Sequence, residues 1–200
     1  MSLQAEKENE TRLARLHQDE LSDVLRRHAR YVQRLAGGRR AALPFHDLSL
    51  LDFGRADLIG VDLTGARLHR SVLTAARLVG ATLFGADLRM ANLDRADLSQ
   101  ADLRGASFRA ASMVRSILVG ADLREAVLAR FDPKSGAITD NAVRSTADFT
   151  LAQAQGADLT EVKAAGASVL RADFTDAVLR GADFGLSLIH ISEPTRQAEI

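Results

Sequence analysis

The sequence predicts an all-β solenoid, in which the chain winds around a narrow axis lined with apolar side chains. Three observations predict this fold class. From Leu48 to Leu128 every fifth residue is Leu, Phe or Met, and the residue two positions earlier is usually Ala. A period of five fits neither the 3.6-residue repeat of a helix nor the two-residue repeat of a continuous strand. Aromatic residues make up only 4% of the chain and Trp is absent, which is sparse for a compact globular core.

Each five-residue unit is predicted to be a short strand followed by a corner. In a strand the side chains alternate between the two faces, so the Ala and the Leu of a unit point inward and the polar residue between them points outward. The clearest units are Ala86-Asp87-Leu88, Ala91-Asn92-Leu93, Ala96-Asp97-Leu98 and Ala101-Asp102-Leu103. Such a repeat spreads stability along a stack of similar units instead of concentrating it in one core.

This A-[DNRST]-L-x-x repeat resembles the pentapeptide-repeat family, and it continues without a gap from Leu48 to Leu128. The resemblance implies a right-handed quadrilateral β-helix of pentapeptide repeats, with four pentapeptides in each coil. It also implies a bacterial protein of a kind often without assigned activity. Some members of the family imitate the shape and charge of duplex DNA and protect DNA topoisomerases from inhibitors.

Residues 1–40 lack the five-residue period and are predicted to form an N-terminal amphipathic α-helix and a linker. Apolar residues recur there at steps of three and four, and Gly37-Gly38 is predicted to end the helix. The segment is basic, but its interspersed acids and narrow apolar stripe favour docking on the solenoid, or on a second copy, over a membrane surface. We expect the helix to cap the first coil near Phe45–Phe53, and docking on the outer strip of Ile59, Val79, Ile117 and Val119 is the second choice. The residues expected to make this contact are Leu21, Val24, Leu25, Val32 or Leu35.

The remainder of the chain divides into four segments. Residues 41–128 form the first array, and the period then fails over residues 129–146, which we interpret as an insertion loop. The period resumes at Phe149, one residue out of phase, in a second, truncated array at residues 147–185. Two of its large positions are Ala, so this array is predicted to be the weaker. Residues 186–200 resemble translated sequencing-adapter read-through and are expected to be a non-native scar that packs against nothing specific.

No catalytic, cofactor or metal site is predicted, so we do not expect an enzyme. The chain has no Cys, its five His are scattered, and no nucleophile and base stand together. The recurring Asp residues follow from the repeat itself and are interpreted as a solvated face. The absence of Cys, of a long apolar span and of a signal peptide favours a cytoplasmic location.

Two outer surfaces stand out when positions twenty residues apart are grouped on one side. The candidate apolar face contains Ile59, Val79, Ile117 and Val119. The candidate basic face contains Arg67, Arg70, Arg89, Arg109 and Arg130. We expect such surfaces to engage an unknown protein partner, and a homodimer is left open.

Nucleic acid is disfavoured as a partner because the formal net charge is zero and no aromatic residues interleave the basic stripe. A DNA-mimic modulator of a topoisomerase is kept as the alternative function. It is disfavoured because imitation of duplex phosphates needs a continuous acidic face, and no side of this array is uniformly acidic. The sequence therefore favours a non-catalytic protein-interaction or scaffold module.

Overall fold

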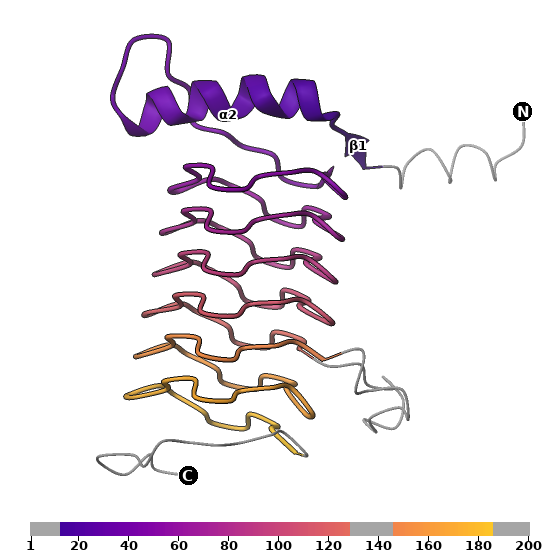
Figure 1. The fold of residues 1–200 in the computed structure, drawn as a ribbon, viewed down its shortest axis with the longest axis vertical. Coiled ribbons are helices and arrows are strands. Elements are labelled where there is room, and N and C mark those ends of the chain that lie inside the picture. Colours follow the sequence, from indigo (N-terminus) through magenta and orange to yellow (C-terminus); the bar gives the residue numbers. More distant parts are fainter. Residues whose placement is uncertain (1–12, 129–145, 186–200) are drawn as a thin grey trace, which may run out of the picture.

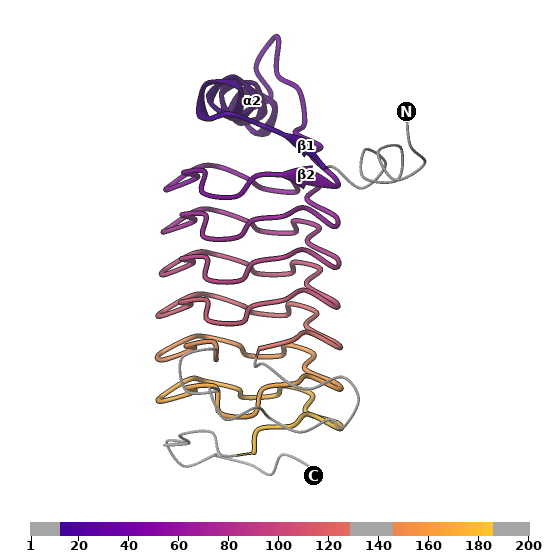
Figure 2. The same ribbon diagram turned by 90° about the vertical axis from the view of Figure 1, so that its right-hand side faces the viewer.

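The computed structural model describes residues 13–128 and 146–185, which form a straight stack of coils with one helix lying across its end (Figures 1 and 2). Strand β1 (Ala14–Arg15) leads into helix α2 (Gln18–Val32), and strand β2 (His46–Asp47) opens the array. β1 pairs in parallel with β2, so the segment before the helix adds one more rung to the stack. Beyond these elements, the coils are joined by isolated parallel bridges.

The bridges define a coil of four pentapeptides. Asp62 pairs with Thr82, Thr82 with Asp102, and Asp102 with Asp122, so successive coils repeat every twenty residues. Each pentapeptide contributes a single bridged residue, the outward one between the small and the large inward residues. The short strand predicted from the sequence is thus only one bridged residue long, because a corner turns the chain within each unit.

The axis of the stack is filled by the predicted inward pair. The large residues are buried from Leu48 to Leu128, and the Ala two positions before each is buried wherever Ala occupies that site in the array from Ala66 onward. The two Ala at large positions of the second array, Ala154 and Ala164, are buried as well. Burial weakens only in the last coil, where Leu179 is 36% exposed and Phe174 is partly buried.

The corners depend on one residue of left-handed conformation in each unit. In the unit that contains Leu88, the N–H of Ala91 donates to the carbonyl of Leu88, and Met90 adopts φ of 59° between them. Gly fills some of these positions, as at Gly80, whereas Arg95 and others adopt the same conformation with a side chain. Glycine favours positive φ because it has no Cβ, but the corner does not require it.

In most units whose outward residue is Asp or Asn, that residue has a second role that the sequence analysis did not assign. Its side chain accepts a hydrogen bond from the backbone N–H two residues later, as in Asp62 with Thr64 (3.0 Å) and Asn92 with Asp94 (2.9 Å). This bond braces the corner and is the reason Asp and Asn suit the position. The recurring Asp residues are therefore structural in addition to being solvated.

Helix α2 caps the first coil, as the sequence predicts. Leu21 is fully buried against the core, and Leu16, Val24 and Leu25 pack there in part. Leu35, the most distal candidate, is instead 49% exposed, because it lies beyond the helix.

The helix ends earlier than the sequence predicts, at Val32 and not at Gly37-Gly38. Arg34 takes the left-handed position (φ 57°), the N–H of Leu35 donates to the carbonyl of Arg30, and that of Arg34 donates to Tyr31. These two bonds form a Schellman motif with Arg in place of the usual glycine. Gly38 serves the following loop, since a Cβ there would collide with the backbone of Tyr31.

Side chains from α2 bind the backbone groups that the first coil leaves open. The amide of Gln18 donates to the carbonyl of Asp52 (3.0 Å) and accepts from its N–H (2.9 Å), as a neighbouring strand would. His28, also fully buried, accepts at Nδ1 from the N–H of Ala41 (2.9 Å). Burial lowers the pKa of His28, and the nearby carboxylate of Asp57 only partly opposes this effect.

The insertion adds residues without disturbing the stack. Ser112 pairs with Asp148, and the other three bridges of this coil span the insertion at the same interval. From the bridge between Asp148 and Ser168 onward, the interval is again twenty. Phe149 consequently stacks below Met113, whose N–H donates to the carbonyl of Asp148 (2.8 Å). The five-residue period of the second array is therefore shifted by one residue in the sequence, but its large residues still continue the columns of the first array. The insertion itself, at residues 129–145, and the suspected scar at residues 186–200 lie outside the described residues.

We expect Leu98→Ala to lower the free energy of unfolding by about 2–5 kcal/mol, because it leaves a cavity on the closely packed axis. Leu50→Ala is the matched control, since Leu50 is 63% exposed and should lose less than about 1 kcal/mol. Denaturant titration of both variants measures the difference. Equal losses would contradict the inward assignment of the large residues.

Gln18→Ala should accelerate amide hydrogen exchange at Asp52, because its N–H would lose its partner and face water. Val72, one coil below, donates to the carbonyl of Leu51 and should exchange at the wild-type rate. If Asp52 remains as protected as before, the amide of Gln18 does not close the edge.

The stability of the protein should fall between about pH 7 and pH 5, the range that spans the pKa of His in an unfolded chain, about 6.5. Because burial lowers the pKa of His28, the unfolded state binds more protons there, and unfolding becomes easier as the pH drops. His28→Asn should flatten this slope in thermal melts across the range. A variant that keeps the wild-type slope would exclude His28 as its source.

Candidate interaction surfaces

The predicted apolar face lies on one side of the rod but is not continuous. Ile59, Val79 and Val119 occupy the same column, and the ladder places Ser99 between the last two. Ile117 lies in the neighbouring column of that side, where it pairs with Asp97. Val119 is 38% exposed and the other three are half-buried. The strip therefore offers small apolar areas separated by polar ones.

The predicted basic face also lies on one side, but part of its charge is neutralised in place. Arg89 binds Asp87 through two hydrogen bonds of 2.6 Å, and Arg67 lies 3.9 Å from Asp47. Arg109 follows Arg89 one coil further along, and Arg70 stands at the adjoining corner with φ of 56°. Arg130 lies outside the described residues.

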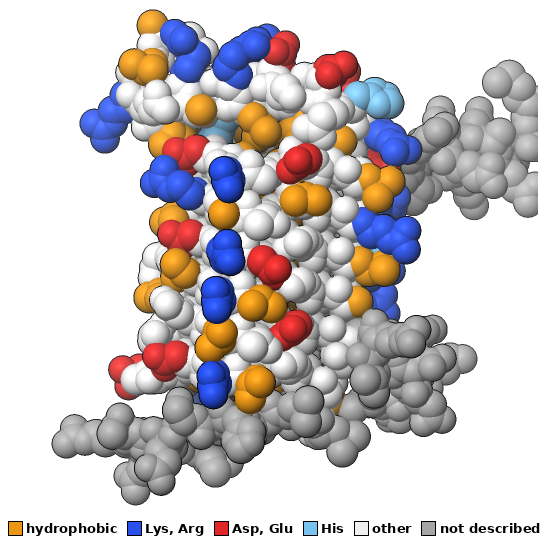
Figure 3. Space-filling view, viewed as in Figure 1, with side chains coloured by type: hydrophobic (Ala, Val, Ile, Leu, Met, Phe, Trp, Pro, Cys, Tyr) orange, Lys and Arg blue, Asp and Glu red, His pale blue; other side chains and the backbone are white. Residues whose placement is uncertain are grey.

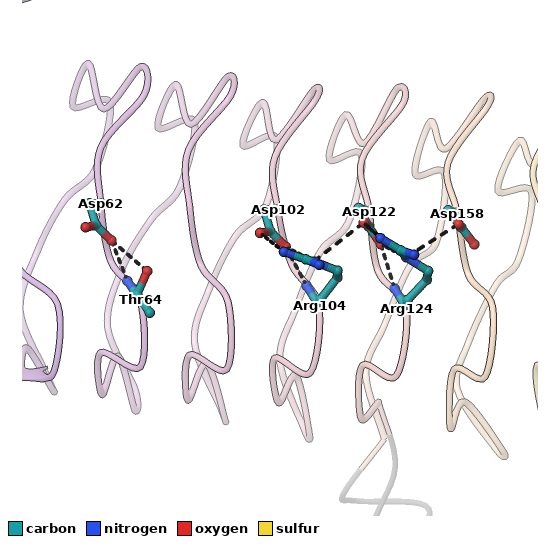
Figure 4. A network of polar contacts seen from close by, with 7 residues as sticks. All are labelled: Asp62, Thr64, Asp102, Arg104, Asp122, Arg124 and Asp158. Atoms are coloured by element: carbon teal, nitrogen blue, oxygen red, sulfur yellow. Dashed lines mark hydrogen bonds and ion pairs between the residues drawn. The ribbon is translucent and has the colours of Figure 1, made fainter.

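The most acidic side carries a network of alternating charges (Figure 4). Arg104 binds Asp102 of its own coil at 2.8 Å and approaches Asp122 of the next coil at 3.6 Å. Arg124 repeats the arrangement, binding Asp122 at 2.6 Å and approaching Asp158 at 3.6 Å. Hydrogen bonds from Arg104 and Arg124 hold the pKa of Asp102 and Asp122 below the usual range. Asp102, Asp122 and Asp158 are therefore already partnered by arginines, whereas Asp62 accepts its hydrogen bonds from Thr64.

An exposed aromatic residue borders this network. Phe84 is 49% exposed, and the guanidinium carbon of Arg104 lies 5.3 Å from the centre of its ring. A cation at this distance is attracted by the face of the ring. The network thus ends on an apolar surface that the sequence analysis did not single out.

A third charged surface was missed by the sequence analysis. One corner of the rod carries residues 55, 75, 95, 115, 151 and 171 on successive coils, as the ladder of backbone hydrogen bonds shows. Four of these six residues are arginines, which we call the arginine edge: Arg55, Arg95, Arg115 and Arg171. All four are exposed and adopt positive φ. Figure 3 shows a line of basic side chains running down the rod.

The signal for the arginine edge was present in the sequence but divided by the insertion. Arg95 and Arg115 are twenty residues apart, whereas Arg171 follows Arg115 after the enlarged coil. If every coil is assumed to have twenty residues, Arg171 is assigned to the wrong column. The bridge between Ser112 and Asp148 shows that the coil with the insertion is longer, and this places Arg171 in the column of Arg115.

No candidate for catalysis emerges from the described residues. Within residues 13–128 and 146–185, His, Asp and Glu side chains do not gather in threes that could hold a metal ion. In the same part of the chain, no helix has the length and hydrophobicity needed to span a bilayer. The candidate functional features of the described residues are therefore outer surfaces. They are the apolar strip, the columns of paired charges and the arginine edge.

Comparison with known proteins identifies the repeat. The family described as pentapeptide repeats (8 copies) matches residues 52–89, 91–128 and 157–186. Among curated proteins, no sequence matches this chain.

Similar solved structures include HetL, a pentapeptide repeat protein involved in heterocyst differentiation regulation in the cyanobacterium Nostoc. It is 28% identical over 76% of this chain and 79% of its own, with a TM-score of 0.27. A pentapeptide repeat protein of the Arabidopsis thaliana thylakoid lumen is 31% identical over 62% and 68%, with a TM-score of 0.27. QnrB1, a plasmid-mediated fluoroquinolone resistance protein, is 17% identical over 71% and 80%, with a TM-score of 0.39. By its family match and its twenty-residue coil, this chain belongs to the pentapeptide-repeat family.

Proposed function

We propose that this protein is a non-catalytic interaction module, a rigid rod whose outer faces bind a protein partner. The observation that carries this proposal is the fixed presentation of outer side chains. Bridges and hydrogen bonds tie every coil to the next, so surface residues stand in columns about 4.8 Å apart, the spacing of hydrogen-bonded strands. A surface of this kind is organised before binding, which reduces the entropic cost of association.

The family resemblance adds finer expectations to this proposal. We expect a right-handed winding of the coils, a bacterial source and a cytoplasmic location. A homodimer is one form that the protein partner can take. Each of these is a prediction that follows from the resemblance or from the composition of the chain.

The alternative function is that of a DNA mimic acting on a topoisomerase. A mimic of duplex phosphates needs a column of unpartnered carboxylates, because its partner must bind them in place of phosphate. Here Asp102 and Asp122 are held by Arg104 and Arg124. In two other columns acids alternate with arginine, as in Asp57–Arg77–Asp97, where Arg77 binds Asp57 at 2.8 Å. This arrangement supports the interaction module over the mimic.

We expect the purified protein to leave DNA gyrase supercoiling unaffected and to capture a protein that can be identified by mass spectrometry. The capture should depend on an outer face. Val119→Glu changes the apolar face, and Val178→Glu is a control on another side, where Val178 is 48% exposed. Both variants should melt at the wild-type temperature. Val119→Glu should lose the partner, whereas Val178→Glu should still capture it.

Inhibition of supercoiling that disappears in Asp102→Asn, Asp122→Asn protein would instead establish the DNA mimic. If both Val variants still capture the partner and gyrase supercoiling is unaffected, the protein is an interaction module whose binding surface lies elsewhere on the rod. Capture of no partner at all would contradict the proposal.

A further inference from the structure

We propose that the arginine edge is the docking site for an extended acidic segment of a protein partner, in which carboxylate residues alternate with apolar ones. This inference rests on the proposed interaction function and names the chemistry of the partner. It is carried by three observations: the pairing state of the arginines, the geometry of their column, and the residues that flank it.

The arginine edge differs from most other arginines of the array because its guanidinium groups have no carboxylate partner within residues 13–128 and 146–185. Arg77, Arg89, Arg104 and Arg124 each bind an Asp at 2.6–2.8 Å. Among the described residues, no ion pair or hydrogen bond of the four edge guanidinium groups is present. An exposed arginine that has no partner among the described residues is available to bind a carboxylate of another chain.

The column is straight and of fixed length. The N–H of Arg95 donates to the carbonyl of Val114 (2.9 Å), and that of Arg115 to Thr150 (3.0 Å), so neighbouring edge residues keep the spacing of the ladder. At about 4.8 Å for each coil, Arg55 and Arg171 stand about 24 Å apart. An extended peptide rises about 3.3 Å per residue and would span this distance with about seven residues. Arginine side chains are long enough to absorb the difference between the two spacings.

The flanks of the edge favour a narrow ligand over a nucleic acid. Asp52, Asp94 and Asp148 lie along one flank, held by local hydrogen bonds such as that from the N–H of Gly54 to Asp52 (2.7 Å). Asp57, Asp97 and Asp173 lie along the other side of the corner. A duplex or a broad polyanion would bring its phosphates against these acids, whereas a single peptide can follow the corner alone.

Apolar residues fill the intervals between the arginines. Within the column itself, Ala75 and Leu151 occupy the two coils that lack arginine. On the flank, Val72 is 39% exposed and Leu170 is 36% exposed. A partner segment with apolar residues between its acids would bury these surfaces while its carboxylates bind the arginines. This alternation is the reason for proposing a mixed acidic and apolar segment over a purely acidic one.

The test measures binding of a fluorescein-labelled peptide of alternating Glu and Val, about nine residues long, to the full-length protein by fluorescence anisotropy. The edge variant is Arg95→Gln, Arg115→Gln, which removes the central adjacent pair. The control variant is Arg27→Gln, Arg180→Gln, which removes the same net charge from exposed positions outside the arginine edge and the candidate basic face. A peptide of alternating Lys and Val, and a single-stranded oligonucleotide of matched charge, serve as competing ligands. Thermal melts confirm that both variants fold as the wild type does.

The inference predicts saturable binding that weakens with added salt, at least a fivefold loss of affinity in the edge variant, and less than a twofold loss in the control. The Lys peptide should not bind. Equal losses in the two variants would show attraction by net charge alone and overturn the proposal. Tighter binding of the oligonucleotide, lost in the edge variant, would assign the edge to nucleic acid and also overturn it.

Failure of this inference can be separated from failure of the proposed function. If the Glu-Val peptide does not bind while a protein partner is captured through another face, the acidic-segment assignment is wrong and the interaction module stands. If the protein inhibits supercoiling through its carboxylates, both are wrong.

Discussion

The ladder of backbone hydrogen bonds between coils is the constraint on which the rest of the structure depends. It fixes the interval of twenty residues, and with it which side chains share a column, which point to the axis and which face a neighbour above or below. The stacked Leu, Phe and Met residues make this register the favourable one, since a shift by one residue would turn the large side chains outward. Stability and surface pattern therefore follow from the same set of bonds.

The N-terminal segment covers the first end of the ladder. At the first coil, α2 covers the axis with Leu21, and the side chain of Gln18 supplies the hydrogen bonds of a missing strand. Exposed strand edges are sites of unwanted pairing, and native proteins commonly cover them. The hydrogen bonds of Gln18 continue the backbone ladder of the array into the helix, whereas hydrophobic contacts alone would leave the backbone groups of Asp52 without partners from α2.

The sequence predicts the fold well because its strongest signal, the five-residue period, is also the packing rule. The inward pair, the cap by an amphipathic helix and the site of the insertion follow from where apolar residues occur. The end of the helix was misplaced because glycine is the usual left-handed residue, and here Arg34 adopts that conformation. The bracing role of the Asp side chains was missed because one pattern of polar residues serves both solvation and a local hydrogen bond.

The surfaces were harder to predict, because charge alone does not reveal pairing. Arg89 and Arg95 look alike in the sequence, but only the structure shows that Asp87 neutralises the first and that the second has no carboxylate partner among the described residues. Column membership after the insertion also required the spatial register.

The left-handed corners set function and folding stability against each other at the same residues. A side chain with a Cβ adopts this conformation at a cost of about 1–2 kcal/mol, which glycine avoids. An arginine at such a corner thus displays charge at a cost in stability, and selection for stability alone would favour glycine there. The four arginines of the edge therefore mark the corners of this surface where a displayed charge comes at the cost of local backbone strain.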